Sequence, residues 1–297
     1  MMKKILIAFA ALIWAPLAFA ITPYVSGDKV SGGDVNAVMG QVEKKLAAEG
    51  FTVVGKYSPK GVSQYGVVVV TDKGILDAVR NLGGSAIVGA AIRVGVKADG
   101  TVSYMNPEYW YRAFFRKQYS SAEPAVKALE AKLQKSLGAG KGFGGDESAG
   151  DLPNYHYMVG MERFESNKNE LKSYASFEAA VKAIQDNLAK GTNKTSKVYE
   201  IVVADKKIAV FGVAMNDPKT GEGVWLNKIG TDHIAAQPYE IYVVGGKASA
   251  LYGRYRIALG WPTLGMGTFM KISDSPDEIL ETLTGVAGGT YEKSSAF

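Results

Sequence analysis

The residues best suited to binding chemistry are aromatic and arginine side chains gathered in two segments. Segment 104–119 surrounds Asn106-Pro107, and segment 252–261 holds the corresponding place in the second half of the chain. Arginine presents a planar fork of donors to carboxylate or phosphate and stacks on rings, while tyrosine joins apolar area to a polar tip. The pattern predicts a pocket for an anionic or aromatic ligand, or an interface between the two copies of the module. The alternative is that half of the rings belong to the core and the arginines extend to solvent. The candidate residues are Tyr109, Trp110, Arg112, Arg116, Tyr252, Arg254, Tyr255 and Arg256.

The chain has only two histidines, His156 and His233, and both join this candidate ligand-binding set. A zinc site needs three or four well-spaced ligands, which these two could approach only with Asp232 or Glu162. A hydrolase would need one histidine beside a carboxylate, and no serine lies in a G-x-S-x-G turn. The alternative is that His156 packs among aromatic rings and His233 caps a helix or faces water. The sequence therefore predicts no metal site and no cofactor, and it assigns no catalytic residue.

Three further patterns are weaker. Gly140 to Gly145 matches G-x-G-x-x-G, but a dinucleotide loop needs a strand before it and a helix after it. Here a helix is predicted before it and an acidic pair follows, so we expect a flexible linker. Glu108, Glu162 and Glu240 lie near aromatic residues, but nothing in the sequence shows that they converge in one cleft. The methionine-containing segment 264–270 could adapt to a ligand, although its pattern favours the edge of a core strand.

The first twenty residues are typical of a secretory signal peptide. Lys3 and Lys4 precede an apolar run over 5–18, and Ala18-Phe19-Ala20 supplies small residues where a signal peptidase reads. We expect cleavage near Ala20 and a soluble periplasmic or secreted protein without stable membrane insertion. Loss of the two lysines lowers the formal net charge from +5 to +3, which does not favour a nucleic-acid partner.

The absence of cysteine from all 297 residues removes whole classes of function. Disulfides, thiol catalysis, iron–sulfur clusters, cysteine zinc sites and a lipoprotein anchor are all excluded. The composition, 47% hydrophobic and 21% charged, is that of a globular protein that relies on its core for stability.

Hydrophobic periodicity predicts the same order of elements, α-β-β-α-β-β-α, in each half of the chain. The first half has predicted helices over 35–48, 73–82 and 123–137 and strands over 51–57, 66–71, 87–97 and 101–105. The second half has predicted helices over 177–188, 223–229 and 277–286 and strands over 197–203, 208–215, 236–244 and 247–258. We therefore expect an α+β fold with largely antiparallel sheets, divided into a signal peptide (1–20), a first module (21–137), a linker and connecting segment (138–175) and a second module (176–297).

An ungapped pairing of 90–109 with 236–255 supports an internal duplication. It places Gly100, Ser103 and Tyr109 opposite Gly246, Ser249 and Tyr255.

The chain resembles the bacterial domain-of-unknown-function family three-hundred-and-two, in its duplicated exported form. The segments that carry the resemblance are Phe51-Thr-Val-Val-Gly-Lys-Tyr, Met105-Asn-Pro-Glu-Tyr-Trp, Tyr155-His-Tyr-Met-Val-Gly-Met, His233-Ile-Ala-Ala-Gln-Pro-Tyr-Glu-Ile and Tyr255-Arg-Ile-Ala-Leu-Gly-Trp-Pro. The resemblance covers most of the chain beyond the signal peptide and implies an α/β fold. It implies no activity and transfers no site residue.

These observations favour a non-catalytic binding module for a small anionic or aromatic ligand. Two alternatives stay open. One is an envelope accessory protein that binds a protein partner or a second copy of itself through the same aromatic segments. The other is a hydrolase that pairs His156 or His233 with a carboxylate.

Overall fold

The computed structural model describes residues 20–292, and it confirms an α+β fold with antiparallel sheets. The expected signal peptide lies outside the described residues, except for Ala20, which begins the short strand β1 (Ala20–Ile21). Within the described range, no helix has the length and apolar character needed to cross a membrane.

The first sheet has the strand order β3-β4-β5-β6-β2-β7, and every neighbouring pair is antiparallel. One of its interior strands contains an uninterrupted run of valines, residues 67–70, whose side chains are all buried. Such a β-branched run with both faces covered favours a central strand. The strands are β2 (Tyr24–Ser26), β3 (Thr52–Tyr57), β4 (Tyr65–Thr71), β5 (Ile92–Lys97), β6 (Val102–Met105) and β7 (Gly142–Phe143).

The second sheet has the order β10-β11-β12-β13-β9 and is also antiparallel throughout. Its strands are β9 (Glu170–Ser173), β10 (Thr195–Val203), β11 (Ile208–Met215), β12 (Tyr239–Val244) and β13 (Lys247–Ser249). A separate short ladder joins β1 to β8 (Glu147–Ser148).

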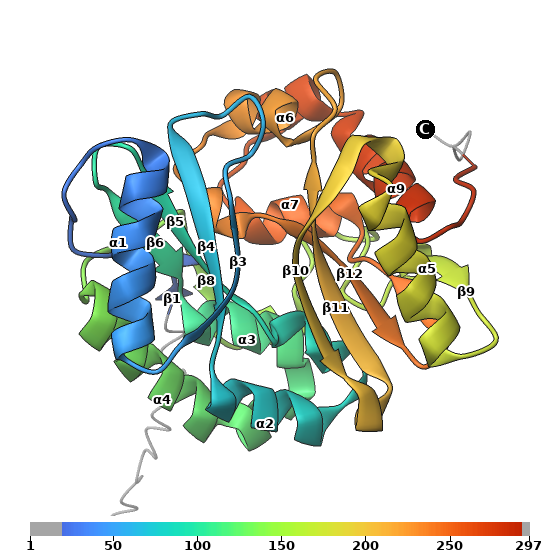
Figure 1. The fold of residues 1–297 in the computed structure, drawn as a ribbon, viewed down its shortest axis with the longest axis horizontal. Coiled ribbons are helices and arrows are strands. Elements are labelled where there is room, and N and C mark those ends of the chain that lie inside the picture. Colours follow the sequence, from blue (N-terminus) through green and yellow to red (C-terminus); the bar gives the residue numbers. More distant parts are fainter. Residues whose placement is uncertain (1–19, 293–297) are drawn as a thin grey trace, which may run out of the picture.

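Helices surround the two sheets (Figure 1). Capping residues fix several of their starts: Asp34 accepts from two amides of the first turn of α1, and Asn106 precedes Pro107 at the start of α3. Figure 1 shows α1 beside the first sheet and α5 with α9 beside the second. The helices are α1 (Val35–Ala48), α2 (Lys73–Leu82), α3 (Pro107–Phe115), α4 (Tyr119–Leu137), α5 (Phe177–Ala189), α6 (Glu222–Ile229), α7 (Gly253–Gly260), α8 (Met266–Phe269) and α9 (Ser275–Val286).

The observed order α1-β3-β4-α2-β5-β6-α3 corresponds to α5-β10-β11-α6-β12-β13-α7. The hydrophobic pattern predicts the same order, but it places the last helix of each half at 123–137 and 277–286, which are within α4 and α9. Descent of both halves from one duplicated module stays a prediction. The segment 138–175 is more than a linker, because it contributes β7 to the first sheet and β9 to the second.

The predicted strand over 247–258 is wrong in its second part. Strand β13 ends at Ser249, and residues from Gly253 onward form α7. The reason is a tertiary contact: the amide of Ala250 donates to the carbonyl of Asn169 at 2.9 Å, and the amide of Tyr252 donates to the Asn169 side chain at 3.0 Å. These bonds to one residue end the ladder and turn the chain into the helix.

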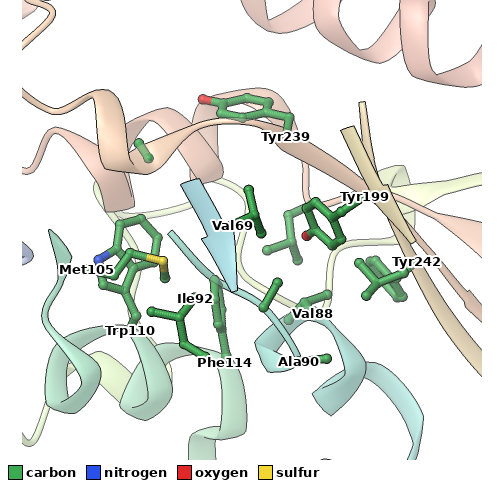
Figure 2. Close-up of a cluster of buried hydrophobic side chains, with 14 of the residues drawn as sticks. Val69, Val88, Ala90, Ile92, Met105, Trp110, Phe114, Tyr199, Tyr239 and Tyr242 are labelled. Atoms are coloured by element: carbon green, nitrogen blue, oxygen red, sulfur yellow. The ribbon is translucent and has the colours of Figure 1, made fainter. Parts of the chain in front are cut away.

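One hydrophobic core extends through both halves of the molecule. Figure 2 shows Val69, Ile92 and Trp110 of the first half in the same cluster as Tyr199 and Tyr239 of the second. The backbones approach closely where β3 meets β10: a Cβ on Gly55 would lie only 2.2 Å from the carbonyl oxygen of Val198. Glycine is required there because any side chain would separate the two strands.

Three charged side chains are buried at the contact between the halves. Glu240 on β12 forms ion pairs with Arg93 on β5 and, at 3.5 Å, with Arg256 on α7. Arg256 also donates to the carbonyl of Ala236 at 2.6 Å and lies over the rings of Trp110 and Tyr239. Burial lowers the pKa of Arg93 to about 10, which leaves its guanidinium charged at neutral pH. We call Arg93, Glu240 and Arg256 the buried triad.

Replacing Glu240 by glutamine should destabilise the protein by about 3–5 kcal/mol, because two buried guanidinium groups lose their carboxylate. The measurement is the free energy of unfolding in urea at pH 7. Glu43→Gln is the matched control, since Glu43 pairs with Lys56 on the surface at 2.7 Å and should cost no more than about 1 kcal/mol. Equal effects of the two changes would contradict a structural role for the triad.

Candidate functional site

The aromatic residues of the first predicted segment are core residues. Tyr109 and Trp110 on α3 are fully buried. The hydroxyl of Tyr109 donates to the carbonyl of Leu259 at 2.9 Å, and the indole of Trp110 donates to that of Pro23 at 2.8 Å. Both polar tips are therefore satisfied inside the protein, and these rings join the two halves rather than form a pocket.

Arg112 and Arg116 reach the surface with partners already in place. Arg112 bonds Glu108 at 2.7 Å and lies over the ring of Tyr119, while Arg116 pairs with Glu165 and lies over the ring of Phe164. Neither arginine lines the cavity described below.

The second predicted segment divides across α7. Tyr255 and Arg256 face inward and are buried, as is Tyr252 just before the helix. The hydroxyl of Tyr252 donates to Asp277 at 3.2 Å. Arg254 is the partly exposed member of this group, and it lines the cavity.

The two histidines have different surroundings. His233 packs against Trp261, with ring centroids 5.5 Å apart, and its Nδ1 lies 2.9 Å from the carbonyl oxygen of Gly260. Burial lowers the pKa of His233, despite the opposing effect of that carbonyl. His156 is exposed, and its Nδ1 lies 3.3 Å from the carbonyl oxygen of Asn154. Each ring is thus oriented by a backbone carbonyl rather than by a carboxylate.

A cavity of about 470 Å³ lies between the connecting segment and the α7–α8 region. From the connecting segment it is lined by Glu147, Tyr155, His156, Tyr157, Met158 and Met161. From α7, α8 and the residues between them it is lined mainly by Arg254, Ile257, Trp261, Leu264, Met266 and Phe269. The volume is within the range of small-molecule sites, and apolar and aromatic groups dominate the walls.

Of the ten predicted site residues, only His156 and Arg254 line this cavity. The segment 264–270 also contributes, but its prediction as a core strand edge is wrong, because residues 266–269 form α8 and Met266 is 57% exposed. Sequence reasoning does not find the lining methionines and tyrosines of 155–161, because the pattern predicts a linker and connecting segment over 138–175. Their signal in the sequence is Met158-Val-Gly-Met161, an apolar turn in a polar, glycine-rich region.

The cavity has one guanidinium and one carboxylate on its walls. Burial, together with Asp151 and Asp146, raises the pKa of Glu147. The pKa of Arg254 is raised although burial opposes it, because Tyr252 and Glu162 favour its charged form. The cavity wall therefore combines the guanidinium of Arg254, a hydrogen-bond donor, with the carboxyl group of Glu147, whose pKa is raised.

A hard-metal site is not formed by the described residues, which contain no suitable group of three or more histidine, aspartate and glutamate side chains. Glu162, considered as a ligand from the sequence, accepts instead from Tyr157 at 2.6 Å and from Lys168 at 2.7 Å. These bonds lower its pKa although burial acts in the opposite direction.

Comparisons of this chain with protein-family models, with curated proteins and with solved structures found no match. The resemblance to family three-hundred-and-two stays a prediction, and the function is argued from the site alone.

A buried carboxyl group that sequence reasoning missed lies away from the cavity. Glu222, at the start of α6, is 1% exposed. It accepts from the hydroxyl of Tyr57 at 2.9 Å and from the amide of Met215 at 2.8 Å. Burial raises the pKa of Glu222 to about 8, although both bonds oppose the shift. Because Tyr57 belongs to the first half, this group also joins the halves.

The raised pKa of Glu222 makes stability depend on pH. The folded protein holds this proton more tightly than the unfolded chain, so the stabilisation is complete below pH 4.5 and is lost as the pH rises to about 8. We expect Glu222→Gln to remove this decline, which can reach about 1.4 kcal/mol per pH unit. The measurement is the free energy of unfolding in urea from pH 4 to pH 9 for both proteins. Parallel curves for both would contradict the assignment.

Proposed function

We propose that this chain is an exported, non-catalytic binding protein for a small molecule with an apolar, aromatic body and an anionic group. The observation that carries the proposal is the cavity between the connecting segment and α7, where Arg254 lies on an otherwise largely apolar wall. The periplasmic or secreted location rests on the signal-peptide pattern of residues 1–20.

The walls fit an aromatic body. Tyr155, Tyr157, Trp261 and Phe269 bring rings to the cavity, and Ile257 adds aliphatic surface. Tyr155 packs edge-on against buried Tyr255, with centroids 5.9 Å apart. This contact anchors one wall to α7, so that part of the site is formed before a ligand enters.

Arg254 fits the anionic group. A guanidinium has five N–H donors in a planar fork suited to carboxylate, sulfonate or phosphate. One Arg254 nitrogen makes a long bond of 3.4 Å to the hydroxyl of Tyr252, which leaves donors for a ligand. Lys168 and Tyr157 hold the neighbouring Glu162 carboxylate.

The two histidines support binding rather than hydrolysis. A general base is normally oriented by a third group that also stabilises its protonated form, usually a carboxylate. His156 and His233 have carbonyl partners instead.

An envelope protein that docks a partner is the second candidate. Val159, next to the lining residue Met158, is 88% exposed, and clustered apolar exposure of this kind is typical of protein interfaces. The same rim could contact a second copy of the chain.

We expect Arg254→Ala to weaken binding of 8-anilinonaphthalene-1-sulfonate at least about tenfold, because a charge-assisted hydrogen bond contributes about 1.5–3 kcal/mol. The dye carries an aromatic body and a sulfonate, and its fluorescence reports binding.

Native mass spectrometry of the purified chain, compared with its denatured mass, would show any co-purified ligand.

Arg112→Ala is the matched control, because Arg112 is also a partly exposed arginine beside a tyrosine ring but lies outside the cavity. Dye binding that is non-saturable, or equally affected by both variants, would contradict the proposed site. A dimer that excludes the dye from the cavity would favour the docking alternative.

A further inference from the structure

Exposed methionines gather around the cavity. Large apolar side chains that are more than a third exposed are few among residues 20–292, and five of the six lie in two short stretches: Met158, Val159, Met161, Met266 and Met270. Three of them, Met158, Met161 and Met266, line the same cavity at exposures of 43%, 37% and 57%. These three side chains are thus partly exposed and line one cavity.

A tight turn brings two of these sulfur-bearing residues together. The amide of Met161 donates to the carbonyl of Met158 at 3.1 Å, and Gly160 between them has a φ of +81°. The two residues are the first and fourth of a β-turn, whose Cα atoms lie within about 7 Å. Met266 is the first residue of α8 on the other wall. Methionine has three rotatable side-chain bonds, so the thioether groups of these three lining residues can adjust their positions within the cavity.

His156 brings an imidazole to the same opening. When Nδ1 carries the proton, it donates to the carbonyl of Asn154 at 3.3 Å. The lone pair of Nε2 is then free to bind a ligand. A histidine that donates one ring N–H to a backbone carbonyl while the other nitrogen coordinates is the usual arrangement around bound metals.

We propose that Met158, Met161, Met266 and His156 form a binding site for a soft monovalent cation, Cu(I). Thioethers select Cu(I) over hard cations, and imidazole is also a good ligand for copper. The chain contains no cysteine, so methionine is its only soft ligand.

The charges around the cavity accommodate one positive ion. Thioethers and imidazole are neutral, and Glu147 on the same wall supplies a carboxylate. Burial, with Asp151 and Asp146, raises the pKa of Glu147, and a nearby cation would favour its charged form. Arg254 also lines the cavity, and it interacts with Tyr252 and Glu162.

This site is separate from the organic-ligand site of the proposed function, although both share one cavity. Cu(I) uses the thioethers and His156, whereas the anionic ligand uses Arg254. Either proposal can fail without the other.

The test is competition for Cu(I) between the purified full-length chain and bicinchoninate, under anaerobic reducing conditions, with Ag(I) in chloride-free buffer as a redox-inert probe. We expect one ion per chain by native mass spectrometry. We expect each of Met158→Leu, Met161→Leu and Met266→Leu to lower the affinity at least about tenfold, since loss of even an outer-shell partner costs that much. Leucine nearly conserves the side-chain volume, so the fold should persist.

Met270→Leu is the matched control, because Met270 is 61% exposed but does not line the cavity; it should bind Cu(I) like the parent. Arg254→Ala should lose dye affinity and keep Ag(I) affinity. The proposal is overturned by failure to compete with bicinchoninate. It is equally overturned by identical losses in Met270→Leu and the cavity variants, or by Zn(II) binding to the unmodified protein as tightly as Ag(I).

Discussion

The arrangement of this protein depends on the pairing of one buried carboxylate with two buried guanidinium groups. Glu240 belongs to the second sheet, Arg93 to the first sheet and Arg256 to α7. Removing three charges from water is costly, and the loss is recovered only when all three are held in contact. The triad therefore accepts one relative placement of the sheets and α7, which apolar contacts alone would specify less strictly.

The candidate site inherits its geometry from this constraint. Arg256 faces the core, and Arg254, two residues earlier on the same helix, faces the cavity. The contacts that hold Arg256 in the core therefore also orient Arg254 toward the cavity. The opposite wall is attached through Tyr155 to the buried ring of Tyr255, whereas the turn at Met158–Met161 projects beyond that anchor with its methionines exposed. The cavity is therefore lined on one side by residues packed on the core and on the other by partly exposed methionines.

Periodicity predicted most of the elements, because buried strands such as β4 and amphipathic helices such as α1 have local patterns that packing reinforces. It failed where tertiary contacts decide: Asn169, distant in sequence, ends β13 and starts α7. The site was only partly predictable. Arg254 and His156 were found by residue type, but nothing local distinguishes exposed Arg254 from buried Arg256. Arg256 is buried because it contacts Glu240 and Trp110, which belong to other elements.

The position of β2 has a consequence for the order in which the chain can fold. This strand, near the start of the described residues, lies between β6 and β7 in the first sheet, and the hydroxyl of Tyr24 reaches the carbonyl of Gly260 at 2.9 Å. The earliest-synthesised part of the sheet must therefore wait for β7 and then for α7 before its contacts are complete. Pairings of such long sequence separation slow folding, because the entropy lost in closing long loops must be overcome before the contacts form.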